Sequence, residues 1–233
     1  MSKLDSGSRL TLSFDNGPTP EVTPYVLDEL EKRDRTAYFC LVGTQLAAGQ
    51  EQRDIAHETF ARGHILVNHS STHRVPLGED PAAEHAQKEI VDMHTLLHDS
   101  LGDWGAPWFR PFGRGGLLGS HVFSKAAVRE LQARDYSVLL WNSVPRDWEN
   151  VDGWVATALA DMQKQTHTVV VLHDLNTGAM QHLGRFLDVA LAQGVEFTVE
   201  VPEDCRPLVG GEVVWSEEAL DALVCGKNVG AEN

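Results

Sequence analysis

The sequence predicts an α/β protein built on parallel strands. Short apolar runs typical of buried strands alternate with segments whose apolar residues recur at helical spacing, and this order repeats along most of the chain. Repeated β-then-α order favours parallel strands joined by right-handed crossovers. An open doubly wound sheet and a barrel close to the (β/α)₈ type both satisfy the pattern, which does not choose between them.

The expected strands are short, and several end at a polar residue or a glycine. The run TAYFCLV, for example, is closed by Gly43. Strands are predicted at residues 9–14, 36–42, 64–67, 107–109, 136–141, 168–172 and 195–199.

The segments between these strands carry helical patterns. Val26, Leu27 and Leu30 fall on one side of the first such segment, and Gly63 and Gly194 are helix stop signals. Helices are predicted at residues 23–33, 53–62, 82–101, 122–134, 153–163 and 179–192.

A chain of 233 residues is long enough for one domain with a large core. No repeat or linker divides it, so we expect a single domain over residues 1–207 and a short C-terminal extension over 208–233, packed at the domain edge or at a subunit interface. The features expected in the extension are a turn at 210–211, a strand at 212–215, a helix over 217–224 capped by Ser216, and a frayed end over 226–233.

Composition excludes several classes of protein. With 19 basic and 34 acidic residues the formal charge is −15, so a basic surface for nucleic acid is absent, and a polyanionic substrate or an anionic membrane surface is disfavoured. No apolar run is long enough to span a membrane, and the polar residues 1–9 lack the core of a signal peptide, which predicts a cytoplasmic protein or a secreted one whose leader was removed. Cys40, Cys205 and Cys225 are too few and too far apart for a disulfide framework and are expected to be buried or reduced thiols.

Polar side chains follow five of the predicted strands. Because the carboxyl ends of parallel strands open on the same face, these five segments are expected to converge on a site. In chain order they are Asp15–Asn16–Gly17, His69 with His73, Arg110, Asp147–Trp148 and His173–Asp174.

Two pairs of histidines are spaced four residues apart. On a turn of helix such a pair would share a face, and neutral imidazole is a good zinc ligand. His69 and His73 lie at a strand end, which favours metal binding. His94 and His98 lie inside the long amphipathic helix, with no other candidate ligand beside them, and are expected to be structural.

Each of the other polar residues has a functional and a structural interpretation. Asp15 and Asn16 could form a simple turn, or they could supply a general base and an amide metal ligand. His173 could be a satisfied core histidine or a general acid, and Asp147 could be a surface charge or the group that orients His173. Arg110 could form a surface ion pair or hold Asp15 in its ionised form.

Together these segments resemble the motifs of the NodB-type polysaccharide deacetylases, carbohydrate esterase family 4, over about residues 10–199. The family motifs are T-F-D-D-G, H-[ST]-x-x-H, R-x-P-[FY]-G, D-x-x-D-W and L-x-H. The matching segments are SFDNGP at 13–18, GHILVNHSSTH at 63–73, RPFG at 110–113, VPRDW at 144–148 and VLH at 171–173.

The resemblance implies a distorted (β/α)₇-type barrel and metal-assisted hydrolysis of an N-acetyl or O-acetyl group on a sugar. It makes Asp15 the base that deprotonates the attacking water and His173 the acid that protonates the leaving amine. It also makes Asn16, His69 and His73 the ligands of one divalent ion, which is expected to be zinc.

The resemblance further assigns the supporting residues. Asp147 tunes His173, and Arg110 positions Asp15. A backbone N–H near Phe112 meets the oxyanion. Trp148, with Val171 or Leu172, walls the pocket for the acetyl methyl group.

Three departures from the family motifs lie near this site. Asn16 replaces an anionic ligand by a neutral one, so the affinity for the ion is expected to fall. Val144 stands in place of the first Asp of the fourth motif, and the third motif is one residue short, which could shift Arg110.

Two other functions remain open at this point. Hydrolysis of a non-sugar C–N bond in a small cyclic amide or ureide, without metal, would suit a cytoplasmic protein with a neutral residue at position 16. A carbohydrate-binding protein without turnover would have no need of an acid and a base, so the presence of Asp15, His173 and Asp147 argues against it.

Overall fold

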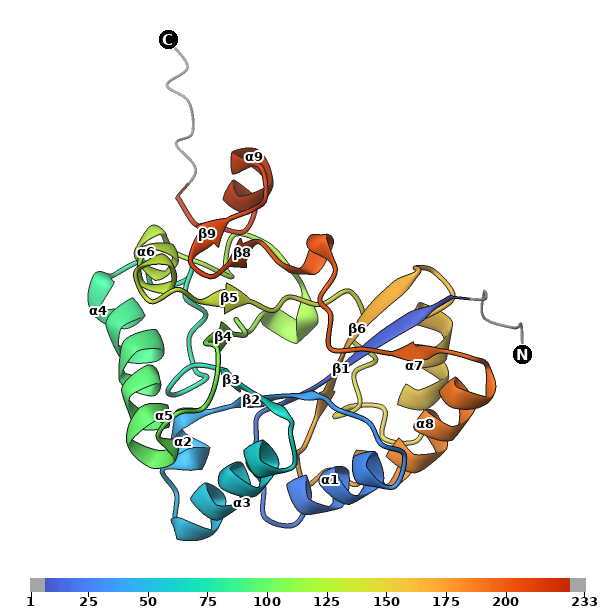
Figure 1. The fold of residues 1–233 in the computed structure, drawn as a ribbon. Helices are drawn as coiled ribbons and strands as arrows, with labels where there is room; N and C mark the ends of the chain where they lie inside the picture. The colour runs from blue at the N-terminus through green and yellow to red at the C-terminus, as the bar shows by residue number, and fades with distance from the viewer. Residues whose placement is uncertain (1–6, 227–233) are drawn as a thin grey trace.

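Strands β1 (Arg9–Asp15) and β6 (His167–His173) lie side by side at the centre of the molecule (Figure 1). The computed structural model describes residues 7–226, so most of the end predicted to fray lies outside the described residues. Nearly all side chains of both strands are buried, as expected for parallel strands covered on both faces. Their parallel register pairs Asp15 with His173, which brings the two predicted catalytic residues to the same edge.

The strands form a parallel sheet in the order β5-β4-β3-β2-β1-β6, with β7 also pairing with β1. An isolated parallel bridge between Ser143 and Val170 joins the segment after β5 to β6 and closes the ring. The fold is therefore a distorted barrel, which confirms the architecture implied by the motifs. The remaining strands are β2 (Tyr38–Leu41), β3 (Ile65–Asn68), β4 (Trp108–Phe109), β5 (Ser137–Val138), β7 (Glu196–Phe197), β8 (Leu208–Val209) and β9 (Glu212–Val213).

Helices cover the outside of the strands (Figure 1). The α-helices are α1 (Thr23–Glu31), α2 (Gly43–Leu46), α3 (Gln50–Ala61), α4 (Ala83–Ala86), α5 (Met93–Leu101), α6 (Lys125–Ala133), α7 (Trp154–Asp161), α8 (Leu183–Ala192) and α9 (Glu217–Asp221). Short 3₁₀ helices are η2 (Arg114–Gly116), η3 (Ala179–His182) and η4 (Glu203–Cys205).

Several expected elements are shorter or divided in the structure, among them the helix over 179–192, which begins as the 3₁₀ helix η3, and the strand and helix of the extension, which end at Val213 and Asp221. The long helix predicted over 82–101 is interrupted by a π-helix, η1 (Gln87–Asp92), between α4 and α5. The strand predicted over 136–141 is paired with its neighbour in the sheet only at Ser137 and Val138. The chain then turns toward β6, as the bridge at Ser143 shows.

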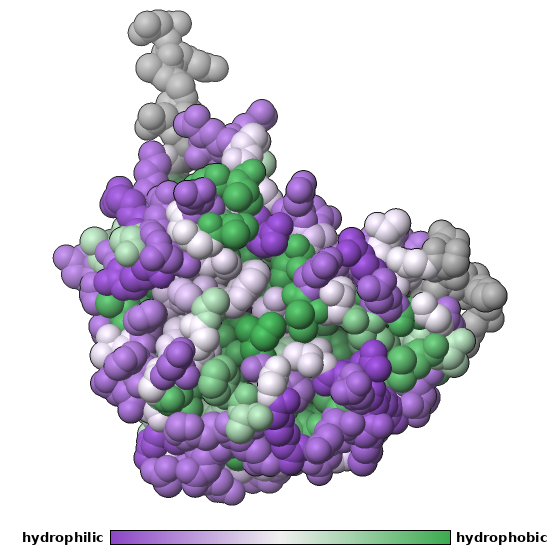
Figure 2. All heavy atoms as spheres, in the orientation of Figure 1, coloured by the Kyte–Doolittle hydropathy of each residue, from purple (hydrophilic) through white to green (hydrophobic). Residues whose placement is uncertain are grey.

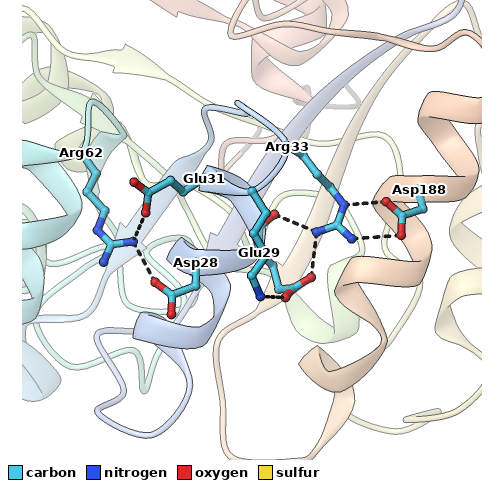
Figure 3. Close-up of polar contacts among 7 residues, drawn as sticks. Asp28, Glu29, Glu31, Arg33, Arg62 and Asp188 are labelled. Atoms are coloured by element: carbon cyan, nitrogen blue, oxygen red, sulfur yellow. Dashed lines mark hydrogen bonds and ion pairs between the residues drawn. The ribbon is translucent and has the colours of Figure 1, made fainter.

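Hydrophilic residues dominate the outer edge of the molecule, while hydrophobic residues gather toward the middle of the face drawn in Figure 2. Arginines link α1 to its neighbours along this polar edge (Figure 3). Arg33 bridges Glu29 of α1 and Asp188 of α8, and Arg62, after α3, binds Asp28. Glu29 is buried, whereas Asp188 and Asp28 are exposed, so solvent screens the pairs that these two aspartates form.

The C-terminal segment packs against the barrel edge beside β5 and α6 (Figure 1). The backbone N–H of Gly211 donates to the carbonyl of Tyr136, and that of Phe123 donates to the carbonyl of Leu223. Ser216 caps α9 by accepting from the N–H of Ala219, which confirms the predicted cap. The division of the chain at residue 207 stays our proposal.

The three cysteines form no disulfide, as predicted, and Cys40 and Cys205 are buried. Within residues 7–226, the helices are all too short or too polar to cross a membrane.

Candidate active site

Loops that follow β1, β3, β4, β5 and β6 meet around one cavity of about 510 Å³. The convergence expected from the parallel order therefore occurs, and the volume is within the usual range for small-molecule sites. The lining residues named in the sequence analysis are Asp15, Asn16, His69, His73, Phe112, Val144, Trp148, Val171 and His173.

Asp15 ends β1 and is buried at the base of the cavity. The Arg110 guanidinium lies 3.5 Å from its Oδ2, and the same guanidinium donates to Ser13 Oγ at 2.9 Å. Burial raises the pKa of Asp15, but the positive charge of Arg110, together with His69 and His173, outweighs it and lowers the pKa below its usual value. Asp15 is thus ionised at neutral pH, and the short third motif does not displace Arg110 from it.

Asn16 follows Asp15 with a left-handed backbone, φ 82°, a conformation that Asn tolerates better than most residues. Its backbone N–H donates to the carbonyl of Cys40 at 3.1 Å, which fixes the turn. Its side-chain Oδ1 is buried and has no hydrogen-bond partner among the described residues. A buried amide oxygen left without a donor at a cavity is suited to a cation.

His69 and His73 lie on a loop after β3, which corrects the expectation that a helical turn brings them together. Left-handed residues at Ser70 and His73 fold the loop so that the two ring centroids are 4.8 Å apart. His69 Nδ1 lies 2.8 Å from the carbonyl of Arg110, so the ring donates there, and in the neutral ring Nε2, 3.5 Å from Asp15 Oδ2, carries no proton. A second hydrogen bond that fixes the tautomer in this way is typical of histidine ligands.

Both rings are neutral at physiological pH. Burial lowers the pKa of His69 to about 3, and burial also lowers the pKa of His73. His73 stacks on the Phe112 ring at a centroid distance of 4.1 Å. Two neutral imidazoles and an unpaired amide oxygen fit a divalent ion such as zinc. Within residues 7–226, no three His, Cys, Asp or Glu side chains gather as a metal site, and the third donor expected from the motifs, Asn16, is an amide outside that set of residue types.

His173 ends β6 and is held twice by Asp147, which is fully buried. Asp147 Oδ1 accepts from the ring Nδ1 at 2.8 Å, and Oδ2 accepts from the backbone N–H of His173 at 2.9 Å. Burial lowers the pKa of His173, but the hydrogen bond and the charge of Asp147 outweigh it, so the pKa is raised overall. The raised pKa favours the protonated ring, which is the form that a general acid requires.

Of the residues predicted to contact the acetyl group, Trp148 and Val171 line the cavity and Leu172 does not. Trp148 meets the His173 ring edge-on, with centroids 4.6 Å apart, and Val171 lines the cavity. Leu172 is fully buried in the core and lies outside the cavity lining, because successive side chains of a strand point to opposite faces. Of the two residues offered for this wall, the structure places Val171 at the cavity.

Several further lining residues were not singled out in the sequence, among them Trp141, Arg146 and Glu149. Trp141 ends a predicted strand, so the expectation that residues at strand ends converge on a site, which identified His173, could also have identified Trp141. Arg146 pairs with Glu149 and lies over the Trp148 ring. Nothing in the local pattern distinguishes that pair from an ordinary surface ion pair.

Histidines 94 and 98 do not reach the cavity. His94 Nδ1 lies 2.8 Å from the hydroxyl of Tyr136 and its ring packs against Trp104, whereas His98 is exposed beside Asp99. The structural role predicted for the pair fits the packing of His94, while exposed His98 makes only the contact with Asp99.

The barrel and its cavity define the class: an α/β-barrel protein with a cavity, lined by buried aspartate and histidine side chains, at the carboxyl ends of its parallel strands. The chain belongs to the polysaccharide deacetylase family, because the model of that family matches residues 3–131. It is also 31% identical, over 173 residues and 72% of each chain, to a chitooligosaccharide deacetylase of Bradyrhizobium sp..

Other relatives cover this chain more fully. A peptidoglycan-N-acetylglucosamine deacetylase of Listeria monocytogenes is 22% identical over 84% of the chain, but the chain spans only 38% of that protein. The catalytic domain of a peptidoglycan N-acetylglucosamine deacetylase from Eubacterium rectale has the same fold, with a TM-score of 0.70, 19% identity, and coverage of 91% of this chain and 97% of that one. A family 4 acetyl xylan esterase from Clostridium thermocellum, in complex with a cobalt ion, gives a TM-score of 0.63 at 21% identity, with coverage of 81% and 86%.

Proposed function

We propose that the protein hydrolyses an acetyl group from an N-acetylated sugar, or from an O-acetylated one. The observation that carries the proposal is that Asp15, kept ionised by Arg110, and His173, whose protonated form Asp147 favours, line one cavity. Membership of the polysaccharide deacetylase family supports the choice of an acetylated sugar as substrate.

A divalent ion held by Asn16, His69 and His73 would supply Lewis-acid polarisation of the acyl oxygen. Zinc is our choice for this ion, and the cobalt ion in the acetyl xylan esterase supports a divalent metal in this fold. The ligand role of Asn16 rests on its unpaired buried Oδ1.

Asp15 is the base in this proposal. It takes a proton from the attacking water, and Arg110, buried behind it, keeps the carboxylate ionised between turnovers. The backbone N–H of Phe112 would donate to the developing oxyanion.

His173 then donates its proton to the leaving amine, and Asp147 stabilises the protonated ring before that step. Trp148 and Val171 wall the space for the acetyl methyl group. Proton removal and proton delivery are thus assigned to two residues whose strands are neighbours in register.

The test is release of acetate from chitooligosaccharides and from N-acetylated peptidoglycan fragments by the zinc-loaded protein. Acetate and free amine are expected in equal amounts, and Asp15→Asn and His173→Ala are expected to abolish both products. Absence of acetate from all these substrates, with the wild-type protein folded and metal-loaded, would overturn the proposal.

The neutral Asn16 favours one second candidate, hydrolysis of a small cyclic amide or ureide without metal. A ring-opened product formed without acetate, and insensitive to a chelator, would establish it.

A further inference from the structure

Glu89 is a buried carboxyl that the proposed reaction does not use. It lies on the π-helix η1, is 1% exposed, and no Lys, Arg or His side chain among the described residues forms an ion pair with it. A buried carboxylate without a cation beside it is unfavourable unless hydrogen bonds or a function compensate. The hydrogen bonds of Glu89 therefore indicate its role.

Both oxygens of Glu89 accept hydrogen bonds from Thr72, which directly precedes His73. Oε2 accepts from the backbone N–H at 2.8 Å, and Oε1 accepts from the hydroxyl at 2.7 Å. Glu89 thus fixes the position and the backbone orientation of the residue next to a candidate metal ligand.

The backbone of η1 holds the start of the same loop. The carbonyl of Glu89 accepts from the N–H of Ser71 at 3.0 Å, and the carbonyl of Lys88 accepts from the Ser71 hydroxyl at 2.7 Å. The next carbonyl, of Ile90, accepts from the Asn68 side chain at 3.0 Å. Three consecutive carbonyls of a π-helix are therefore docked against the segment that carries both histidines, and π-helices are frequent at functional sites.

The loop needs such support. Ser70 and His73 have positive φ angles of 72° and 53°, a conformation that is unfavourable for residues other than glycine. Unfavourable backbone conformations persist where the surroundings hold them, and they cluster at ligand sites. The hydrogen bond from the N–H of His73 to Ser70 Oγ, 3.1 Å, closes the loop on itself but does not anchor it to the rest of the protein. Ser71 anchors the start of the loop to the backbone of η1, and Thr72 anchors its end, next to His73, through the Glu89 side chain.

We propose that Glu89 is a positioning residue for the cation site: through its two hydrogen bonds to Thr72 it holds His73 where it can bind a divalent ion together with His69 and Asn16. This inference rests on the metal site of the proposed function. Glu89 touches neither the ion nor the substrate and acts only through the loop.

The test is the affinity of the full chain for Zn²⁺ and Co²⁺, measured by competition with a chelator at a temperature where every variant is folded. Glu89→Ala is expected to weaken the affinity about 10- to 100-fold, the usual effect of losing a partner that orients a metal ligand. Glu89→Gln keeps an acceptor for the Thr72 N–H and a partner for its hydroxyl, so it is expected to restore the affinity to within about threefold of wild type. The visible absorption spectrum of bound Co²⁺ is expected to change in Glu89→Ala and to be unchanged in Glu89→Gln.

A second pair of variants tests the same contact from the other side. Thr72→Val removes the hydroxyl and is expected to weaken binding, whereas Thr72→Ser keeps the hydroxyl and is expected to bind as wild type. Glu84→Ala, at an exposed position of α4, which directly precedes η1, is the control for the loss of a nearby glutamate and is expected to bind as wild type.

The outcomes separate the two proposals. Wild-type affinity and spectrum in Glu89→Ala would overturn the role of Glu89 and leave the metal site intact. Equal weakening in Glu89→Ala and Glu89→Gln would also overturn it, because the hydrogen bonds would then not be the cause. Absence of any Zn²⁺ or Co²⁺ binding by the folded wild-type protein would overturn the metal site itself, and with it this inference.

Discussion

The contact between Asp147 and His173 provides the sharpest test of the acid–base assignment. Asp147→Asn keeps the shape of the side chain but removes its charge, so only the charges of Asp15 and Asp174 would still oppose the effect of burial, and we expect the pKa of the His173 ring to fall. At 2.8 Å and an effective dielectric constant of about 20, Coulomb's law gives roughly 6 kcal/mol between unit charges. Solvation of the remaining groups reduces this figure, and close opposite charges typically change a pKa by about 1–3.

The assay is kcat/KM for acetate release between about pH 5 and pH 9, beside an NMR titration of the His173 ring. We expect the alkaline limb of the profile to move to lower pH by about 1–3, because kcat/KM reports the groups of the free enzyme. At pH 8 the rate of Asp147→Asn would then be about 10- to 1,000-fold below wild type, and the difference would shrink toward pH 5.

The stability of the protein should change in the same direction. A raised pKa of His173 in the folded state stabilises wild type below the unfolded pKa of about 6.5, and this contribution is lost as the pH rises through the folded pKa. Asp147→Asn should lose that stabilisation at acidic pH. Asp152→Asn, an exposed change in the same loop, is the control. An unchanged titration of His173 in Asp147→Asn would refute the reasoning.

Three further predictions concern the same edge of the barrel. Asn16→Asp adds a negative charge at the candidate metal site and should tighten Zn²⁺ binding in equilibrium dialysis; unchanged affinity would mean that Asn16 is not a ligand. His173→Ala should lower kcat about 10²- to 10⁴-fold with the circular dichroism spectrum of the folded protein preserved; near-wild-type turnover would remove the general acid. Gly17→Ala would place a Cβ 2.1 Å from Asp174 Oδ2 and should lower the free energy of unfolding by about 1–3 kcal/mol in urea, whereas Gly119→Ala, which meets only ordinary contacts, should change little. Equal stability of these two variants would show that the turn after β1 is looser than described.

Much of the candidate site could be predicted because each of its residues follows a strand. The alternation of strand and helix patterns implies parallel strands, and parallel strands bring Asp15, Arg110 and His173 to one edge whatever the loops between them do. The three do meet around one cavity wall, with Arg110 behind Asp15. The position of His94 and His98 inside the long predicted helix was likewise enough to distinguish them from the candidate metal ligands. In the structure His94 contacts the hydroxyl of Tyr136, away from the cavity.

Other features could not be predicted from local pattern. The register of β6 against its neighbours decides which of Val171 and Leu172 faces the cavity. A shift of the register by one residue would turn Leu172 toward the cavity and Val171 away from it. The apolar positions of residues 82–101 have the spacing of an ordinary α-helix, so the π-helix η1 could not be predicted from the sequence.

The sequence by itself determined the family, the order of strands and helices, and the set of polar residues at the strand ends, because these depend on residue type and on spacing along the chain. Tertiary structure decided the burial, the contacts and the pKa values of those residues. The closure of the ring at Ser143, the loop that brings His69 to His73, and the opposite pKa changes of Asp15 and His173 all arise from neighbours distant in the chain. Burial and charge act through space, so the chemistry of the site became visible only when the chain had folded.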